Sequence, residues 1–282
     1  MEIIDRVIVS LIYYNSCVRD TLEYTLNREV FDVNLYDHKK RVLTEELKVN
    51  SPLKVFLDRQ GENGAKTIEQ INNFIEEIYG DESTVVKKAP DGLRVDHAQN
   101  IKIFQAVIPL YENLNSIVRI HANYAAEQKI KHETVDQLVY QNERFYRAVA
   151  LLTLSNELYK QFDEFNKVMR ESNGEKTPQS NFIENDLNTV AQLFNTTRQN
   201  SVCRDSLYTD ALDSVAFALE MMNGRRDLPQ GKTFGDVFQD SNAKISKFVQ
   251  DAESKWKELY TPALNELIED TKAAQPAQEV KA

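Results

Sequence analysis

Glycine and proline are scarce in this chain, and their scarcity limits the folds that it can adopt. The sequence has 8 glycines and 7 prolines among 282 residues, whereas average usage would give roughly 34 of the two together. A multi-stranded sheet needs frequent tight turns, which glycine and proline mostly supply. Apolar residues recur every three or four positions, and strict alternation never lasts long enough to indicate a strand. The sequence therefore predicts an all-α fold.

Helix start and stop signals divide the chain into long helices. Three Asn-Gly pairs are typical of helix ends. Typical helix starts lie at Ser51-Pro52, Thr67, Thr134 and Asn181. The signals predict helices at 3–27, 29–49, 52–60, 66–79, 97–128, 133–171, 181–222 and 234–271. Because short connections between long helices favour antiparallel neighbours, we expect an elongated up-down-up-down bundle of long antiparallel helices with extra N-terminal helices.

The domain organisation follows from the same pattern. Residues 93–272 are expected to form the long-helix core of the bundle, because the longest helical segments all lie there. Residues 1–92 are expected to be an N-terminal helical extension that packs on the bundle, so that the whole is one domain. Residues 273–282 contain Pro276 and are expected to be a disordered tail.

The charge and hydropathy of the chain disfavour several classes of partner. With 44 acidic and 34 basic residues the net charge is −10, so neither nucleic acid nor an anionic membrane surface is an expected partner. No apolar stretch approaches the ~18 residues that a membrane-spanning helix needs. The first residues lack the pattern of a signal peptide. A cytoplasmic location is therefore the default expectation, with a mature exported form as the alternative.

The motifs of common enzymes and metal sites are missing. The four histidines lack the Glu-x-x-His and His-Glu-x-x-His spacings. Segments 61–67 and 224–233 resemble a phosphate-binding loop, but neither has the required spacing of glycine and lysine, and neither follows a strand. Both are explained as turns between helices that end in a threonine cap. Cys17 and Cys203 are expected to be small buried hydrophobes, with one disulfide between them as the alternative. We expect no enzyme, no cofactor and no metal site.

One pentapeptide pattern, Asn-Ser followed by two apolar residues and Arg, occurs three times. The copies span residues 15–19, 115–119 and 200–204. In each copy the Asn and the Arg are four residues apart, which places them on one face of a helix. Counting along the predicted antiparallel helices puts the second and third copies at one level of the bundle. The residues of other helices expected near that level are Asn142, Glu143, Arg147, Glu253 and Trp256.

Two interpretations of this pattern stay open. In the first, buried Asn and Arg side chains form a hydrogen-bonded layer that fixes the register of the helices. In the second, the arginines line a mid-bundle pocket for an anionic ligand, with the tryptophan as an apolar wall. The candidate ligand-binding residues are Asn15, Arg19, Asn115, Arg119, Asn200, Arg204 and Trp256. Nearby acids such as Asp20, Asp205 and Glu143 favour the first interpretation, because they can neutralise the arginines within the chain.

These observations predict a function of one of two kinds. The first is that of a non-enzymatic helical interaction or scaffold protein, whose long amphipathic helices bind a protein partner or a second copy of the chain. The alternative is a protein that binds a small anionic ligand through the Asn and Arg layer. An enzyme is not expected, because the sequence shows neither a nucleophile with its base nor a set of metal ligands.

Overall fold

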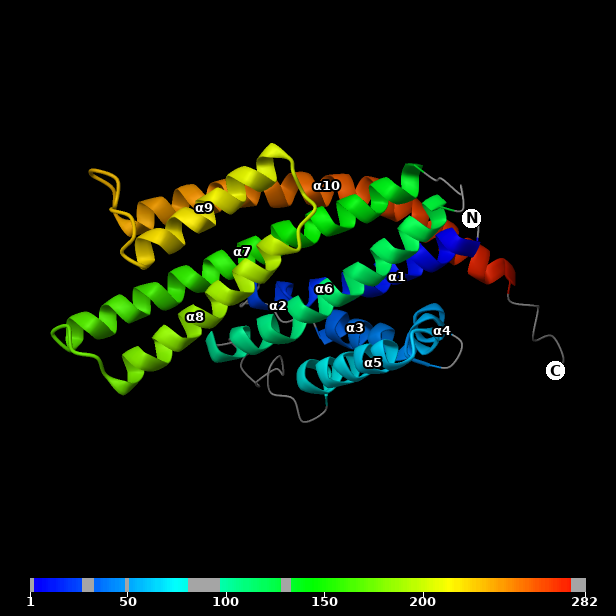
Figure 1. Ribbon diagram of the computed structural model, residues 1–282, viewed down its shortest axis with the longest axis horizontal. Helices are drawn as coiled ribbons and strands as arrows, with labels where there is room; N and C mark the ends of the chain where they lie inside the picture. The colour runs from blue at the N-terminus through cyan, green and yellow to red at the C-terminus, as the bar shows by residue number, and fades with distance from the viewer. Residues whose placement is uncertain (1–2, 27–32, 49–50, 81–96, 128–132, 275–282) are drawn as a thin grey trace.

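The computed structural model describes residues 3–26, 33–48, 51–80, 97–127 and 133–274. Every regular element within these ranges is a helix, which confirms the predicted all-α helical bundle. Figure 1 shows an elongated molecule in which the longest helices lie lengthwise and the short N-terminal helices pack along one side. The bundle therefore has its long axis parallel to most of its helices.

The helices follow one another along the chain as labelled in Figure 1. They are α1 (Ile3–Asp20), α2 (Glu23–Leu26), α3 (Val33–Glu45), α4 (Pro52–Arg59), α5 (Glu62–Phe74), the π-helical turn η1 (Ile75–Tyr79), α6 (His97–Glu127), α7 (Glu133–Glu171), α8 (Pro178–Gln199), α9 (Ser206–Met222) and α10 (Phe234–Ala274). The 39 residues of α7 and the 41 residues of α10 make helices about 58 and 61 Å long. Helix α7 packs against α1, α6, α8, α9 and α10, so it is the central helix of the bundle.

Local sequence explains where two of the helices begin. Helix α4 follows Ser51, whose Oγ accepts a hydrogen bond from the N–H of Lys54 at 3.1 Å, and this start is the predicted one. Helix α8 begins at 178, not at the predicted 181, because Thr177 and Ser180 form a reciprocal capping box. Helix α5 likewise begins at Glu62, directly after Gly61, and not at the predicted 66.

The first two predicted helices, 3–27 and 29–49, are shorter in the structure. The expected helix 3–27 is interrupted after residue 20, and α2 is a separate single turn. The expected helix 29–49 contains α3, while residues 27–32 and 49–50 lie outside the described residues. The tight chain turn at Thr21 and Leu22 buries both side chains completely, so packing against the core sets this interruption.

The predicted helix 181–222 is two helices, and this is the main correction to the sequence-based fold. Helix α8 ends at residue 199, residues 201–204 are not helical, and α9 begins after Asp205. The Oδ1 atom of Asp205 caps α9 by accepting a hydrogen bond from the N–H of Tyr208 at 3.1 Å. Asn, Ser, Thr and Asp side chains compete with helical hydrogen bonds, and these residues concentrate between 195 and 206. The helix therefore ends where they concentrate.

Helix α9 runs back along the molecule and does not continue the direction of α8. Glu184 near the start of α8 and Met222 at the end of α9 line the same cavity, beside Leu158 of α7. Both helix ends therefore lie at one end of the bundle, as Figure 1 also shows. Consecutive long helices from α6 to α10 thus run in opposite directions in the described part of the chain, as predicted, but there are five of them and not four.

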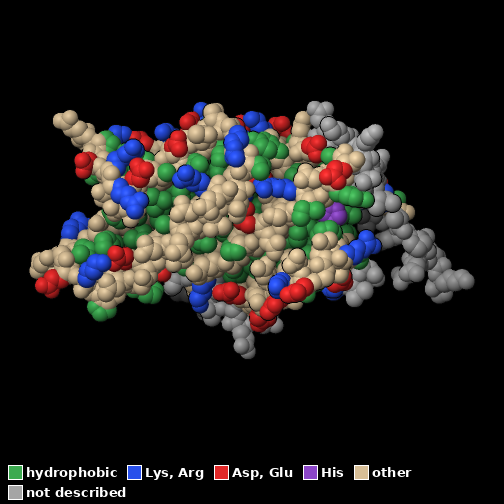
Figure 2. Space-filling view, in the orientation of Figure 1, with side chains coloured by type: hydrophobic (Ala, Val, Ile, Leu, Met, Phe, Trp, Pro, Cys, Tyr) green, Lys and Arg blue, Asp and Glu red, His purple; other side chains and the backbone are tan. Residues whose placement is uncertain are grey.

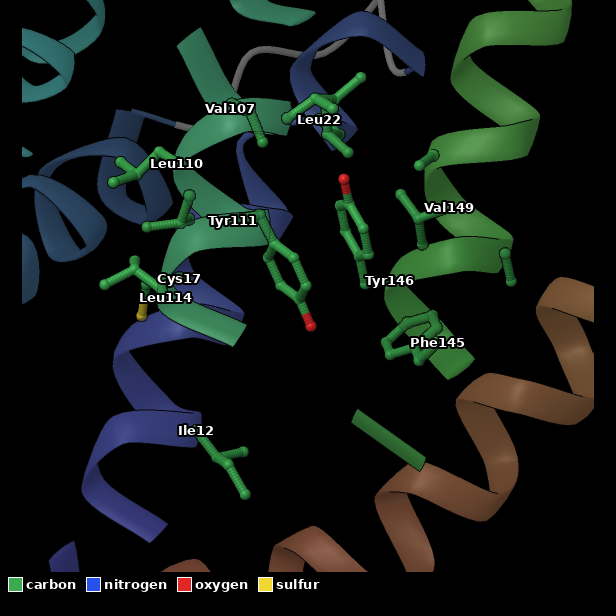
Figure 3. Packing of buried hydrophobic residues seen from close by; sticks show 14 of the residues in the cluster. Ile12, Cys17, Leu22, Val107, Leu110, Tyr111, Leu114, Phe145, Tyr146 and Val149 are labelled. Carbon is green, nitrogen blue, oxygen red and sulfur yellow. The ribbon is translucent and has the colours of Figure 1, made fainter. Parts of the chain in front are cut away.

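A single cluster of buried hydrophobic residues connects the N-terminal helices with the long helices. It includes Ile8 and Ile12 of α1, which are fully buried, together with residues of α6, α7 and α10. Tyr111 of α6 stacks on Tyr146 of α7 with their ring centroids 3.6 Å apart, and Figure 3 shows the two rings face to face with α1 beside them. The core is therefore shared between residues on both sides of position 92.

The predicted domain boundary near residue 92 lies outside the described residues, so the division into extension and core stays a prediction. Helix α10 continues to Ala274, so its last two residues belong to the predicted tail, and residues 275–282 lie outside the described part of the chain. No helix in the described ranges is long and apolar enough to cross a membrane.

The two cysteines are buried and carry free thiols. Burial raises the pKa of Cys17 and of Cys203 to about 12, so neither is a reactive thiolate at neutral pH. The prediction of small buried hydrophobes is confirmed, and the alternative of a disulfide between them is wrong.

Candidate functional site

The carboxylate of Glu143 lies buried in the middle of the bundle, at the centre of a network of polar side chains. Its Oε2 accepts hydrogen bonds from Nδ2 of Asn115 at 3.3 Å and from Nε of Arg119 at 3.0 Å, and Nη2 of Arg119 pairs with the same oxygen. Its Oε1 accepts from the N–H of Val202 at 2.9 Å and from Nη2 of Arg147 at 3.4 Å. One carboxylate thus joins α6, α7 and the connection between α8 and α9.

Arg147 is fully buried and binds two elements besides its own helix. Its Nη1 donates to the carbonyl oxygen of Thr197 at 2.8 Å, and its Nη2 donates to Oε2 of Glu112 at 3.0 Å. Burial opposes the charge, but the hydrogen bonds from Arg147 to Glu112, with the nearby Tyr146 and Glu143, outweigh it and raise the pKa of Arg147. The guanidinium is therefore a permanent buried cation that holds the last turn of α8 against α7.

Arg144 connects the same level of α7 to α9 and α10. Its Nε and Nη2 donate to the two carboxylate oxygens of Asp205 at 2.9 and 3.2 Å, and its Nη1 lies 2.7 Å from Oδ2 of Asp251. Burial acts against the charge of Arg144, but these two carboxylates outweigh it and raise the pKa of the guanidinium. We call the charged and polar side chains that meet at this level the polar layer; its members are Glu112, Asn115, Arg119, Glu143, Arg144, Arg147, Asp205 and Asp251.

Arg19 and Trp256 lie together, as the second interpretation requires. The guanidinium carbon of Arg19 is 4.2 Å from the ring centroid of Phe145 and 4.5 Å from that of Trp256. Nε and Nη2 of Arg19 both donate to Oδ1 of Asp20, at 2.8 and 2.5 Å. Burial works against the charge, but Asp20 outweighs it and raises the pKa of Arg19. A cation held between two rings and a carboxylate gains from both kinds of contact.

The third copy of the pentapeptide does not bring its side chains into the layer. Arg204 is exposed and donates only to the carbonyl oxygens of Ser201 at 3.0 Å and Cys203 at 2.7 Å. The side chain of Asn200 is also exposed, although its carbonyl oxygen accepts from Nη2 of Arg119 at 3.2 Å. Because α8 ends at residue 199, a spacing of four residues no longer places the two side chains on one helix face. The two side chains therefore do not share a helix face as the spacing predicted, and their assignment as ligand-binding residues stays a prediction.

The neighbours inferred by counting along the helices are mostly in place. Asn142 is fully buried, donates its Nδ2 to the hydroxyl of Tyr111 at 3.0 Å, and stands next to Glu143 in the sequence. Glu253 pairs instead with Lys257 at 2.6 Å on the outer side of α10 and does not join the layer. The level of the layer was thus predictable from helix lengths, whereas the direction of each side chain was not.

Sequence reasoning missed three charged members of the layer: Glu112, Arg144 and Asp251. One signal was available in α7, where residues 142–147 are all buried and include three charged side chains in a row of six. Charged residues are almost never fully buried unless they are paired. A buried charged segment in a central helix therefore predicts partners on the neighbouring helices.

Several buried polar atoms around Arg19 have no hydrogen-bond partner among the described residues. They are Nδ2 and Oδ1 of Asn15, Nη1 of Arg19 and Nε1 of Trp256. Asn15 is 0% exposed, and a buried polar atom without a partner costs about 1–3 kcal/mol. Three of the four atoms are donors, so this spot would suit a hydrogen-bond acceptor.

The charges at this level of the bundle are balanced within the chain. Arg19 faces Asp20, Arg119 faces Glu143, and Arg144 faces Asp205, each through an ion pair. No group of three or more His, Cys, Asp or Glu in the described ranges could hold a metal ion.

Comparison with known proteins yields no match to a family model, a curated protein or a solved structure. The geometry of the chain alone therefore carries the proposal of function.

Proposed function

We propose that this chain is a non-enzymatic helical interaction protein, a scaffold that binds a protein partner along its long helices. The polar layer supports this proposal because its arginines are neutralised by carboxylates of the same chain, which suits a role in holding helices together. On the face shown in Figure 2, acidic and basic side chains are interspersed. Such a surface does not favour a partner that is recognised by charge alone, such as nucleic acid.

The observation that carries the proposal is a pair of uncovered apolar side chains on α6. Ile120 is 60% exposed and Tyr124, one helical turn later, is 53% exposed. Ile120 also lines a groove between α6 and the α4–α5 pair, so the apolar surface continues into a concave region. Contiguous exposed apolar surface, unlike single exposed side chains, is typical of a site that another protein covers. We call Ile120 and Tyr124 the α6 strip.

The double variant Ile120→Asp/Tyr124→Asp tests this proposal. Phe182→Asp is the matched control, because Phe182 is 59% exposed on α8, away from the strip. We expect wild type and the control to bind the same partner from a lysate of the source organism, or to show the same mass increase with concentration by light scattering. The double variant should lose that binding while its circular dichroism stays helical. A wild-type monomer of 32.5 kDa that binds nothing would contradict the proposal.

Binding of a small anionic ligand is a second candidate, favoured by the unpaired donors around Arg19. Native mass spectrometry of freshly purified protein tests it. A mass above 32.5 kDa that disappears on denaturation is expected if such a ligand is bound. The extra mass should be absent from Arg19→Met and present in Arg204→Met, because Arg204 is exposed and outside the layer. A clean monomer or dimer mass would mean that the unpaired donors around Arg19 hold no such ligand.

A further inference from the structure

A groove of about 390 Å³ lies between the α4–α5 pair and α6, within the range of roughly 300–1,000 Å³ that is typical of binding pockets. Gly64 allows α5 to approach the end of α4, because a Cβ at this position would lie 1.8 Å from the carbonyl oxygen of Leu57. On the other side, Nδ2 of Asn113 donates to Oγ1 of Thr67 at 3.1 Å and to Oε1 of Gln70 at 2.8 Å. The two walls of the groove are therefore fixed relative to each other.

The lining of the groove is almost uncharged. Its single cation, Lys66, pairs with Glu62 of the same helix at 3.0 Å, and no Asp or Glu is among the described residues that line it. In the whole chain, by contrast, 28% of residues are charged. A cationic ligand would meet no carboxylate of the lining, and an anionic ligand would meet only Lys66, which already pairs with Glu62, so a charged ligand would lose hydration for little return. The groove thus favours an uncharged ligand.

Four carboxamide side chains line the groove: Gln60, Asn63, Gln70 and Asn113. The carboxamides of Gln60 and Asn63 make no hydrogen bond to other described residues. A carboxamide offers a donor and an acceptor together, which matches the N–H and C=O groups of an extended peptide. A helical peptide already uses these backbone groups in its own hydrogen bonds. The lining therefore favours an extended segment over a helix.

An apolar wall completes the groove. Phe56 of α4 and Ile117 and Ile120 of α6 contribute to it. The ring of Phe56 packs against the imidazole of His121 with centroids 4.2 Å apart, so its position is supported by α6. This wall has room for an apolar side chain beside the carboxamides.

We propose that the groove binds an extended, uncharged peptide segment of a partner protein, with one apolar side chain of the segment packed against Phe56 and Ile120. The carboxamides of Asn63 and Gln60 hydrogen-bond the backbone of the segment. This inference rests on the proposed function, because it names the surface and the chemistry of the partner.

Selection from a phage-displayed library of short random peptides against the full chain tests the inference. The groove variant Asn63→Asp/Gln70→Glu adds negative charge with little change of shape, and Glu at position 70 still accepts the hydrogen bond from Asn113. The matched control Asn72→Asp/Asn73→Asp makes the same kind of change on α5 at exposed positions outside the groove lining. Enriched peptides are then synthesised with a fluorophore, and their affinities for the three proteins are compared by fluorescence anisotropy.

We expect wild type to enrich peptides without charged residues and with one apolar side chain. The groove variant should bind them about tenfold more weakly and the control within about twofold. Enrichment of charged peptides, of helix-forming peptides, of peptides that bind the groove variant as well as wild type, or of none would overturn the inference. The same variants are also compared for binding of the protein partner. If Ile120→Asp/Tyr124→Asp loses the partner but the groove variant still binds it, the proposed function stands and the inference about this groove fails.

Discussion

The buried carboxylate of Glu143 accepts hydrogen bonds from α6, α7 and the α8–α9 connection at once. The variant Glu143→Gln removes the negative charge that Arg119 and Arg147 face, and it leaves one amide oxygen where two carboxylate oxygens accepted. We expect the free energy of unfolding to fall by about 3 kcal/mol or more, measured by chemical denaturation followed by circular dichroism.

The control for this substitution is Glu253→Gln. Glu253 pairs with Lys257 on the surface of α10, so its loss should change the free energy of unfolding by less than about 0.5 kcal/mol. If both variants lose equally little, Glu143 does not hold the layer together.

The arginines of the second and third pentapeptide copies make a matched pair. Arg119→Met removes two hydrogen bonds to Oε2 of Glu143, and we expect it to lower the free energy of unfolding by about 1–3 kcal/mol. Arg204→Met removes contacts only to carbonyl oxygens of its own connection, and a change within about 0.5 kcal/mol is expected. Equal losses would mean that the second and third copies have equivalent roles.

The stability of the α8–α9 connection should depend on pH through Asp205. Partial burial raises the pKa of this carboxyl, but hydrogen bonds from Arg144 and from the N–H of Tyr208 outweigh burial, and the pKa lies below its ordinary value of 3.8. A carboxyl whose pKa is lower in the folded state contributes stability above its unfolded pKa and loses it as pH falls through the folded pKa. The ion pair of Asp205 therefore contributes fully to the free energy of unfolding at neutral pH. This contribution is lost as the pH falls below 3.8, the ordinary pKa of an aspartic acid.

We expect Asp205→Asn to be less stable than wild type at neutral pH and to approach it in acid. Urea denaturation at a series of acidic pH values measures this convergence. Asp213→Asn, an exposed position on the same helix, should follow the wild-type profile throughout. A constant difference between Asp205→Asn and wild type at every pH would exclude the ion pair with Arg144 as its cause.

At the scale of elements, the α4–α5 pair depends on Gly64. A Cβ there would overlap the carbonyl oxygen of Leu57, so Gly64→Ala should force the two helices apart and cost about 1–3 kcal/mol. Gly235 in α10 is the matched control, because the nearest atoms to its added Cβ are 3.6 Å away. Gly235→Ala should therefore stabilise the protein by about 0.5–1 kcal/mol. Thermal unfolding should give a lower midpoint for Gly64→Ala and a higher midpoint for Gly235→Ala than for wild type. An unchanged midpoint for Gly64→Ala would mean that the α4–α5 contact is adaptable.

The elements also show how far the sequence predicts this fold. Scarce glycine and proline and the apolar spacing predicted α6, α7 and α10 closely, because long regular helices depend on local signals. The pentapeptide is helical at 15–19 and 115–119 but not at 200–204. Its five residues do not differ in kind between copies. The two carboxylates that hold the third copy in its non-helical form lie outside the pattern: Asp205 caps α9, and Glu143 accepts the hydrogen bond from the N–H of Val202.

For the candidate site, sequence reasoning located the level of the layer but only part of its membership. Glu143 and Arg147 were inferred by counting residues along antiparallel helices, which fixes height in the bundle. Arg144 and Asp251 were missed, because counting does not say toward which neighbour a side chain is directed. That direction depended on α9 lying beside α7 and α10, and hence on the unexpected reversal after α8.

At the scale of the whole molecule, the shared core predicts a single unfolding transition. Trp256 is the one tryptophan of the chain, and it contacts Arg19 of α1 and Phe145 of α7. Its fluorescence therefore reports on packing between the N-terminal helices and the bundle, whereas far-ultraviolet circular dichroism reports on all helices. We expect the two thermal curves to coincide. Separate midpoints would show that residues 1–92 unfold as a domain of their own.

The hydrogen bond between Val202 and Glu143 also has a consequence for the order of assembly during synthesis. Glu112, Arg119, Glu143 and Arg147 all precede residue 200 in the chain, so they are synthesised before the connection that Arg119 and Glu143 hold. Every side chain that binds the connection from α6 and α7 is thus present in the chain when residues 200–205 are added. The reversal of α9 is therefore specified by contacts between a later segment and side chains from the earlier part of the same molecule, and not by the residues of the turn alone.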